Sequence, residues 1–231
     1  MPMISIFQDN VEFTTATVSE EKTLSIYQLI LEGGLGGQLI IALLIVLLAS
    51  ALFIYFERFF TIKSAAKLDK NFMNRIREYV SEGKLEAASA LCKNKNTPTA
   101  RLIDKGISRI GKPLEDINTA IETAGKLEVY QLEKNVSILA TVSGAAPMIG
   151  FLGTVIGMIV AIHEIANAGG QIDIKMLSDG LYTAMTTTVA GLIVGIIAYV
   201  AYNHLVAKTN KVVYLMEAKS VEFLDLLNEP V

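Results

Sequence analysis

Three stretches of this chain are long and apolar enough to cross a lipid bilayer, and they constrain the fold more than any other feature. The first, Leu39 to Phe56, reads LIIALLIVLLASALFIYF and carries no charge. As a helix it would rise about 27 Å, close to the ~30 Å thickness of the hydrocarbon core. Residues 136–162 and 180–206 also lack Asp, Glu, Lys and Arg, and both exceed the length of a span. We therefore predict an all-α membrane protein with three transmembrane helices.

The composition argues against several other classes of protein. Hydrophobic residues make up 52% of the 231 residues, which is too apolar for a soluble domain of this length. The net charge of -3 is too small to indicate nucleic-acid binding, and the single cysteine, Cys92, permits neither an internal disulfide nor a CxxC metal motif. Residues 1–23 are polar and do not form a classical signal peptide. We expect no cofactor, no metal ion and no nucleic-acid partner.

Lysine and arginine placement predicts the orientation in the membrane. One cation precedes the first span, fifteen lie between the first and second, one lies between the second and third, and three follow the third. The positive-inside rule then places the N-terminus outside and the C-terminus in the cytoplasm. The segments expected outside the three spans are an external arm with a possible interfacial helix at Leu24 to Leu31 (1–38), a cytoplasmic helical region (57–135), an external loop (163–179) and a cytoplasmic tail (207–231).

The cytoplasmic region is predicted to be helical. Phe59 to Ser81 continues out of the first span with apolar residues on one face, and Gly83 then ends that helix. A short helix over 85–92 follows, and Pro98 suits the first turn of the next one. Pro113 opens a helix that runs unbroken into the second span. Two membrane helices would thus extend as long cytoplasmic stalks, with the short helices between them as a cap.

Small and polar residues form a stripe along each of the last two spans. In the second span the bulky residues Met148, Phe151, Leu152, Val155 and Ile159 occupy the opposite positions. Close helix packing explains such stripes, because small residues let helix backbones approach. A narrow hydrated cavity or a polar group of another helix explains them equally well. The stripe residues recur at steps of three and four and are Ser143, Pro147, Gly150, Thr154, Gly157 and Ala161 in the second span, and Thr183, Thr187, Gly191 and Gly195 in the third, with Thr188 beside them.

Two features favour a polar interior over simple packing. Four threonines within six residues supply more polar atoms than packing needs, and Pro147 frees a backbone carbonyl in the middle of a span. Neither span contains Asp, Glu, Lys or Arg, so the carboxylate of a proton relay would have to come from a partner. Glu164, His163 and His204 lie at span ends and are expected to be interfacial residues without a role, and Cys92 a core thiol.

The segments AAPMIGFLGTVIGM and GLYTAMTTTVAGLIVGIIAYVAYN resemble the MotA/TolQ/ExbB proton channel family, and ExbB and TolQ most. The resemblance covers about residues 39–210 and includes the FERFF sequence after the first span. Its most specific part is the pattern Pro-x-x-Gly-x-x-Gly-Thr-Val-x-Gly, which begins at Pro147.

The resemblance implies a pore subunit of a bacterial inner-membrane motor driven by the proton motive force. Five copies would surround a dimer of a single-span partner of ExbD or TolR type, with a periplasm-spanning TonB-like or TolA-like protein as a further partner. The second and third spans would line the pore. An aspartate of the partner's span would face Thr154 and Thr188, with Thr183 and Thr187 beside this ion pathway.

The sequence departs from the ExbB and TolQ pattern at two positions of the third span. Thr183 stands where those proteins carry a pore glutamate, and Ile197 stands at the position of a later proline. The missing glutamate leaves two alternatives. One is a sodium-driven motor, since hydroxyl-lined sites also suit sodium. The other is a non-conducting scaffold that anchors the partner. We do not expect an enzyme, because the cytoplasmic region offers no nucleophile–base set and no glycine-rich phosphate loop.

Overall fold

The computed structural model describes residues 35–67, 69, 71–167 and 174–228, and within them it has seven α-helices and no strand. Three helices are long and apolar enough to cross a membrane: α2 (Leu35–Ala65), α7 (Val136–Asn167) and α8 (Ile174–Asn228). The predicted all-α, three-span fold is therefore confirmed. The interfacial helix expected at Leu24 to Leu31 lies outside the described residues, and the side of the membrane assigned to each segment stays a prediction.

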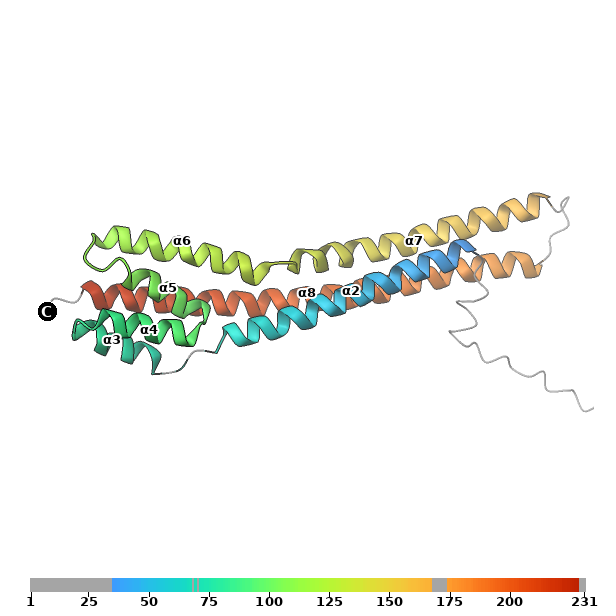
Figure 1. The fold of residues 1–231 in the computed structure, drawn as a ribbon. Helices are drawn as coiled ribbons and strands as arrows, with labels where there is room; N and C mark the ends of the chain where they lie inside the picture. The colour runs from blue at the N-terminus through green and yellow to red at the C-terminus, as the bar shows by residue number, and fades with distance from the viewer. Residues whose placement is uncertain (1–34, 68, 70, 168–173, 229–231) are drawn as a thin grey trace, which may run out of the picture.

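The molecule is elongated, with the spans at one end and the charged helices at the other (Figure 1). The short helices α3 (Phe72–Ser81), α4 (Leu85–Lys95) and α5 (Pro98–Ile107) pack with α6 (Leu114–Glu133) and the last turns of α8. We call this part, α3 to α6 with the end of α8, the charged end. The predicted cap of short helices is present, but the helices that carry it differ from the prediction.

The third span forms the long continuous stalk, which the sequence interpretation missed. α8 runs unbroken for 55 residues, from the membrane-spanning half into the charged end (Figure 1). Beyond the span, the side chains of Val212, Met216 and Phe223 are almost completely buried. Their spacing places them on one helical face. Residues 207–228 are therefore a packed helix against which the shorter helices assemble.

The first span does not continue to Ser81 as predicted. α2 ends at Ala65, and α3 begins at Phe72. Between the two helices, Asp69 accepts two hydrogen bonds. Its side chain accepts from the backbone N–H of Asn71 at 3.1 Å, and its backbone carbonyl accepts from the N–H of Phe72 at 3.0 Å. This local turn competes with a helix, as aspartates often do. Phe72 still lies on a buried face with Ile76, as its spacing predicted.

The helix opened by Pro113 is also interrupted, whereas it was predicted to run into the second span. α6 ends at Glu133, and Asn135 adopts a left-handed conformation with φ of 64° before α7 begins. Asparagine tolerates this region better than most residues. Arg58 of α2 donates a 3.2 Å hydrogen bond to the carbonyl of Gln131. Because the last carbonyls of a helix lack internal partners, this contact compensates the break.

The turns between the short helices follow the sequence signals. Gly83 has φ of 72° and ends α3, so a residue with a β-carbon would be strained there. Pro98 occupies the first turn of α5, and the side chain of Thr97 accepts a 3.3 Å hydrogen bond from the backbone N–H of Ala100. Thr97 is thus an ordinary helix N-cap. Cys92 is buried in the core of the charged end, as predicted.

Candidate ion pathway between the second and third spans

The small residues of the two spans face each other inside a single chain. A β-carbon built on Gly150 would lie 2.8 Å from the carbonyl oxygen of Thr187, and one on Gly191 would lie 2.6 Å from the carbonyl oxygen of Ala146. Only glycine permits so close an approach of two helix backbones. We call this contact the seam; its central residues are Gly150, Gly153 and Gly157 of α7 and Ala184, Thr187 and Gly191 of α8. Close packing therefore accounts for the predicted glycines of both stripes.

Pro147 belongs to the same packed surface. A β-carbon on Gly195 of α8 would lie 2.6 Å from Cγ of Pro147 and 3.1 Å from the carbonyl oxygen of Ser143. Because proline has no backbone N–H, Pro147 leaves this carbonyl of Ser143 without its helical hydrogen-bond donor. The hydroxyl of Ser143 donates a 2.8 Å hydrogen bond to the carbonyl of Ala140. Ser143, Pro147 and Gly195 thus meet at the seam, where α8 covers the freed carbonyl.

Three of the four predicted pathway threonines differ in their environments. Thr187 is completely buried and donates a 2.8 Å hydrogen bond to the carbonyl of Ala184. Thr188 is partly exposed and donates across the seam to the carbonyl of Gly150 at 2.9 Å. Thr154 is partly exposed and donates to the carbonyl of Phe151 at 2.6 Å. Thr187 is a packing residue in this chain, whereas Thr154 and Thr188 retain accessible hydroxyl-bearing side chains.

The first span covers one edge of the seam. A β-carbon on Gly37 of α2 would lie 2.7 Å from Cγ2 of Thr183, and one on Gly36 would lie 3.7 Å from Cγ2 of Ile156. Thr183 of α8 and Ile156 of α7 therefore face α2. The predicted pathway residue Thr183 is thus placed against the first span and apart from Thr188.

Thr154 and Thr188 lie at the other edge. Successive residues of an α-helix turn by about 100°, so Thr154 points about 160° away from Ile156, and Thr188 about 140° away from Thr183. Both threonines therefore face away from α2 and flank the edge that no described helix covers. Each hydroxyl proton is bound to a backbone carbonyl, which leaves the oxygen lone pairs free to accept a hydrogen bond.

His204 has a structural role that the sequence interpretation missed. Its Nδ1 lies 2.9 Å from the hydroxyl of Tyr55, and its ring stacks on Phe59 with 5.8 Å between ring centroids. The contact joins α2 to α8 where the first span ends. The aromatic residues of FERFF could have suggested a partner for His204, but only the fold brings them together. At the other end of the spans, Glu164 is exposed, and His163 lies 3.0 Å from the amide nitrogen of Asn167.

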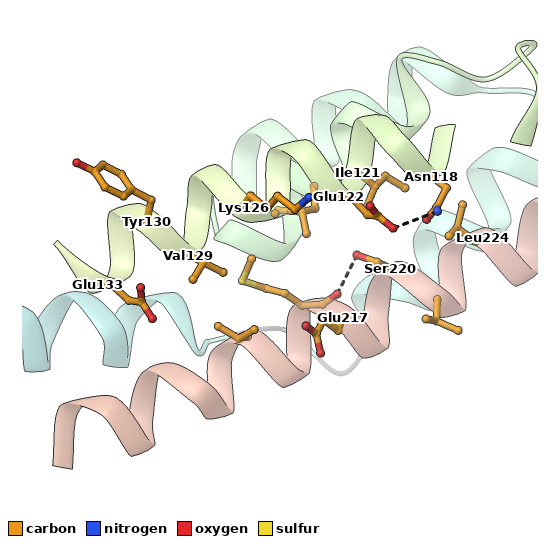
Figure 2. A pocket seen from close by; sticks show the side chains of 15 residues that line it. Asn118, Ile121, Glu122, Lys126, Val129, Tyr130, Glu133, Glu217, Ser220 and Leu224 are labelled. Atoms are coloured by element: carbon orange, nitrogen blue, oxygen red, sulfur yellow. Dashed lines mark hydrogen bonds between the residues drawn. The ribbon is translucent and has the colours of Figure 1, made fainter. Parts of the chain in front are cut away.

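A mainly apolar groove of about 580 Å³ lies between α6 and α8 in the charged end (Figure 2). None of the predicted pathway residues lines it. Two of its polar side chains have local partners: Asn118 donates to Glu122 at 3.3 Å, and Ser220 donates to the carbonyl of Met216 at 2.9 Å. The groove therefore lacks a nucleophile held by a base, and the chemistry of interest lies in the spans.

A sequence profile of the MotA/TolQ/ExbB proton channel family matches residues 94–218, more than half of the chain. The chain is 39% identical over 79 residues to a biopolymer transport protein ExbB of Helicobacter pylori, covering 34% of this chain and 54% of the relative. It is 36% identical over 93 residues to a Tol-Pal system protein TolQ of Haemophilus influenzae, covering 40% of each. The chain thus spans about half the length of the curated relatives that it matches.

Proposed function

Because this chain belongs to the MotA/TolQ/ExbB proton channel family, we propose that it is the pore-forming stator subunit of an ion-driven motor in a bacterial inner membrane. Copies of the chain, five by the family resemblance, would surround a single-span partner of ExbD or TolR type that carries an intramembrane aspartate. The N-terminus would be periplasmic and the charged end cytoplasmic. Proton flow would then energise an outer-membrane or envelope process through the partner and a TonB-like or TolA-like protein.

The observation that carries the proposal is the shared position of Thr154 and Thr188. Both lie at the seam edge that faces away from α2, and both side chains remain accessible. The second and third spans, residues 136–162 and 180–206, contain no Asp, Glu, Lys or Arg. A carboxyl group of a partner helix at this edge would therefore meet two hydroxyls and no competing charge.

Both protonation states of such a carboxyl group can be accommodated by Thr188. A protonated acid would donate to the threonine oxygen, whose own proton remains on the carbonyl of Gly150. An ionised carboxylate would instead accept from the hydroxyl, which must rotate away from Gly150. One hydrogen bond between helices in a membrane contributes roughly 1 kcal/mol, whereas a charge that crosses the membrane contributes about 2.3 kcal/mol per 100 mV. The driving force is therefore large enough to bias this exchange.

Exposed apolar surface on the spans supports assembly with other chains. Met148 is 72% exposed, Phe151 65% and Ile159 62% in the isolated chain. These are the bulky positions that the sequence placed opposite the small-residue stripe. Within a membrane they would face lipid or neighbouring copies of the chain, and the seam edge with Thr154 and Thr188 would face the pore.

A sodium-driven motor is the second candidate. The hydroxyl oxygen of Thr188 and the carbonyl oxygen of Gly150 lie 2.9 Å apart, and both are hard oxygen ligands. Thr183, at the glutamate position of ExbB and TolQ, lies against α2 and supplies no acid. Either ion would therefore depend on the carboxylate of the partner.

The experiment begins with co-expression of the chain and a single-span protein encoded beside its gene, followed by native mass spectrometry of the complex in mild detergent. A pentamer holding a partner dimer is expected. The complex is then reconstituted in liposomes, and proton and sodium uptake are measured for Thr154→Val and Thr188→Val. Thr141→Val and Thr186→Val are the matched controls. Their hydroxyls bond to the carbonyls of Ser137 and Tyr182 on their own helices, and at 100° per residue they point about 140° away from Thr154 and about 160° away from Thr188, respectively.

Loss of flux in the two seam-edge variants alone is expected. Full proton flux in both Thr154→Val and Thr188→Val would contradict the assignment of these two threonines to the ion pathway. Absence of flux in the wild-type complex, with partner binding retained, would favour the non-conducting scaffold.

A further inference from the structure

A polar cavity of about 730 Å³ lies where the end of α2, the turn between α4 and α5, and the end of α6 meet. It contains none of the pathway threonines and is separate from the groove of Figure 2. Four cations line it, Arg58, Lys95, Arg101 and Lys134, together with a single carboxylate, Glu128. The cavity therefore has an excess of positive charge.

The carboxylate is already engaged. Arg101 holds Glu128 in a two-point contact, Nη2 to Oε2 at 2.6 Å and Nε to Oε1 at 2.7 Å. Lys95 forms an ion pair with Asp69, with 3.4 Å between Nζ and Oδ2. In the part of the chain that the structure describes, Lys134 makes no ion pair. Arg58 is paired with Glu57 at 2.8 Å, so the cavity cation without a carboxylate partner among the described residues is Lys134.

Arg58 provides an independent indication of a missing ligand. Only 7% of this residue is exposed, and it lines the cavity. Its Nη1 donates to the carbonyl of Gln131 at 3.2 Å, and its Nη2 to Glu57 at 2.8 Å. Its Nε is buried and has no hydrogen-bond partner among the described residues. Because a buried donor without a partner is costly, this atom points to an acceptor that completes the site.

The cavity lies next to the ends of the apolar stretches of the first and second spans. Arg58 comes two residues after Phe56, the end of the first apolar stretch, and Lys134 comes two residues before Val136, the start of α7. The N-terminal turn of α5, with Thr97 and Pro98, forms another part of the wall. The N-terminus of a helix attracts anions through its dipole and its free N–H groups.

We infer that this cavity binds the phosphate headgroup of an anionic phospholipid in the leaflet on the side of the charged end. A phosphate offers several acceptor oxygens to arginine and lysine, and a lipid brings it to this depth of the membrane. The acyl chains would lie along the apolar surface of α2, where Phe56 and Phe60 are exposed. This binding site does not depend on the proposed motor function.

The test compares two double variants that remove the same charge. Lys95→Gln with Lys134→Gln removes cavity lysines, and Lys63→Gln with Lys208→Gln removes exposed lysines outside it. The full chain, stripped of lipid in detergent, is titrated with palmitoyl-oleoyl phosphatidylglycerol, and bound lipid is counted by native mass spectrometry. Palmitoyl-oleoyl phosphatidylcholine and inorganic phosphate are separate arms. Unchanged thermal unfolding checks the fold of both variants.

One tightly held phosphatidylglycerol per chain is expected in the wild type and in the control variant, with roughly tenfold weaker binding or worse in the cavity variant. Phosphatidylcholine should bind less tightly, because its ammonium group opposes the cations. Equal weakening in both double variants would mean diffuse attraction and would overturn the inference. Inorganic phosphate that binds as tightly as the lipid would also overturn it, in favour of a free-phosphate site.

Discussion

Thr188 of the third span donates a 2.9 Å hydrogen bond to the carbonyl oxygen of Gly150 in the second span. A carbonyl inside a helix already accepts a backbone N–H, so this bond uses its second lone pair. The contact joins the two helices at the edge of the seam where a partner helix would approach. Thr188 can therefore contribute to packing and to the proposed ion pathway, and these roles can be separated.

Replacing Thr188 by valine should affect transport far more than stability. The change removes one interhelical hydrogen bond, worth about 0.6 kcal/mol on average in membrane proteins, while the shape of the side chain is kept. The thermal unfolding midpoint in detergent should therefore shift little, whereas ion flux of the reconstituted complex should be lost. Thr188→Ser keeps the hydroxyl and should retain most of the flux. A serine variant as inactive as valine would indicate that the methyl group, not the hydroxyl, is required.

Alanine at Gly150 or Gly191 should separate α7 from α8. The added β-carbon would lie 2.8 Å from the Thr187 carbonyl oxygen in the first variant and 2.6 Å from the Ala146 carbonyl oxygen in the second, and backbone cannot easily move away. Overpacking of this kind destabilises by roughly 1–3 kcal/mol. Gly144→Ala is the control, because a β-carbon there meets nothing within 4 Å. Thermal unfolding in detergent measures the difference; equal midpoints for all three variants would contradict the close approach at the seam.

The fold class could be predicted from the sequence because it depends on the length of each continuous apolar stretch, which does not involve contacts between distant residues. The three charge-free stretches that begin at Leu39, Val136 and Gly180 lie within α2, α7 and α8. The two interruptions depend on contacts between distant residues and were missed. Arg58 reaches Gln131 only when α2 and α6 lie together, and Asn135 can then end the helix in a left-handed conformation.

The candidate site could be predicted only in part, for a related reason. The spacing of Gly150, Thr154 and Gly157 identifies a face, but not which edge of that face another helix covers. The edge is decided by Gly37, which lets α2 approach Thr183. Thr187 and Thr188, although adjacent in sequence, differ in exposure, because Thr187 packs against Gly153 in the seam and Thr188 lies at its open edge.

Cys92 should be unreactive in the native protein and should make stability depend on pH in alkaline solution. Burial, and to a smaller extent the charge of Asp104, raises the pKa of its thiol from 9.0 to about 12. Above pH 9 the unfolded chain releases this proton while the native state keeps it. The free energy of unfolding should therefore fall by about 1.4 kcal/mol per pH unit between pH 9 and about 12.

The dependence is checked by urea unfolding of the charged end across this range, with Cys92→Ala as the control that lacks the thiol. The wild type should lose more stability than the alanine variant over the same pH interval. Alkylation by iodoacetamide at pH 8 should be slow in the native protein and fast in denaturant. Rapid alkylation of the native protein would contradict the buried position of Cys92.

Gly37 and Thr183 should behave as a coupled pair. A β-carbon on Gly37 would lie 2.7 Å from Cγ2 of Thr183, so Gly37→Ala forces α2 away from the seam or rotates the threonine. Thr183→Ser removes that methyl group, and the double variant should recover most of the stability lost by Gly37→Ala. Gly36→Ala is the matched control, because its β-carbon would meet Ile156 at an ordinary 3.7 Å. Thermal unfolding of the four proteins of the cycle in detergent gives the coupling free energy, expected at about 1 kcal/mol for residues in contact. Strictly additive effects of the two substitutions would contradict the contact between Gly37 and Thr183.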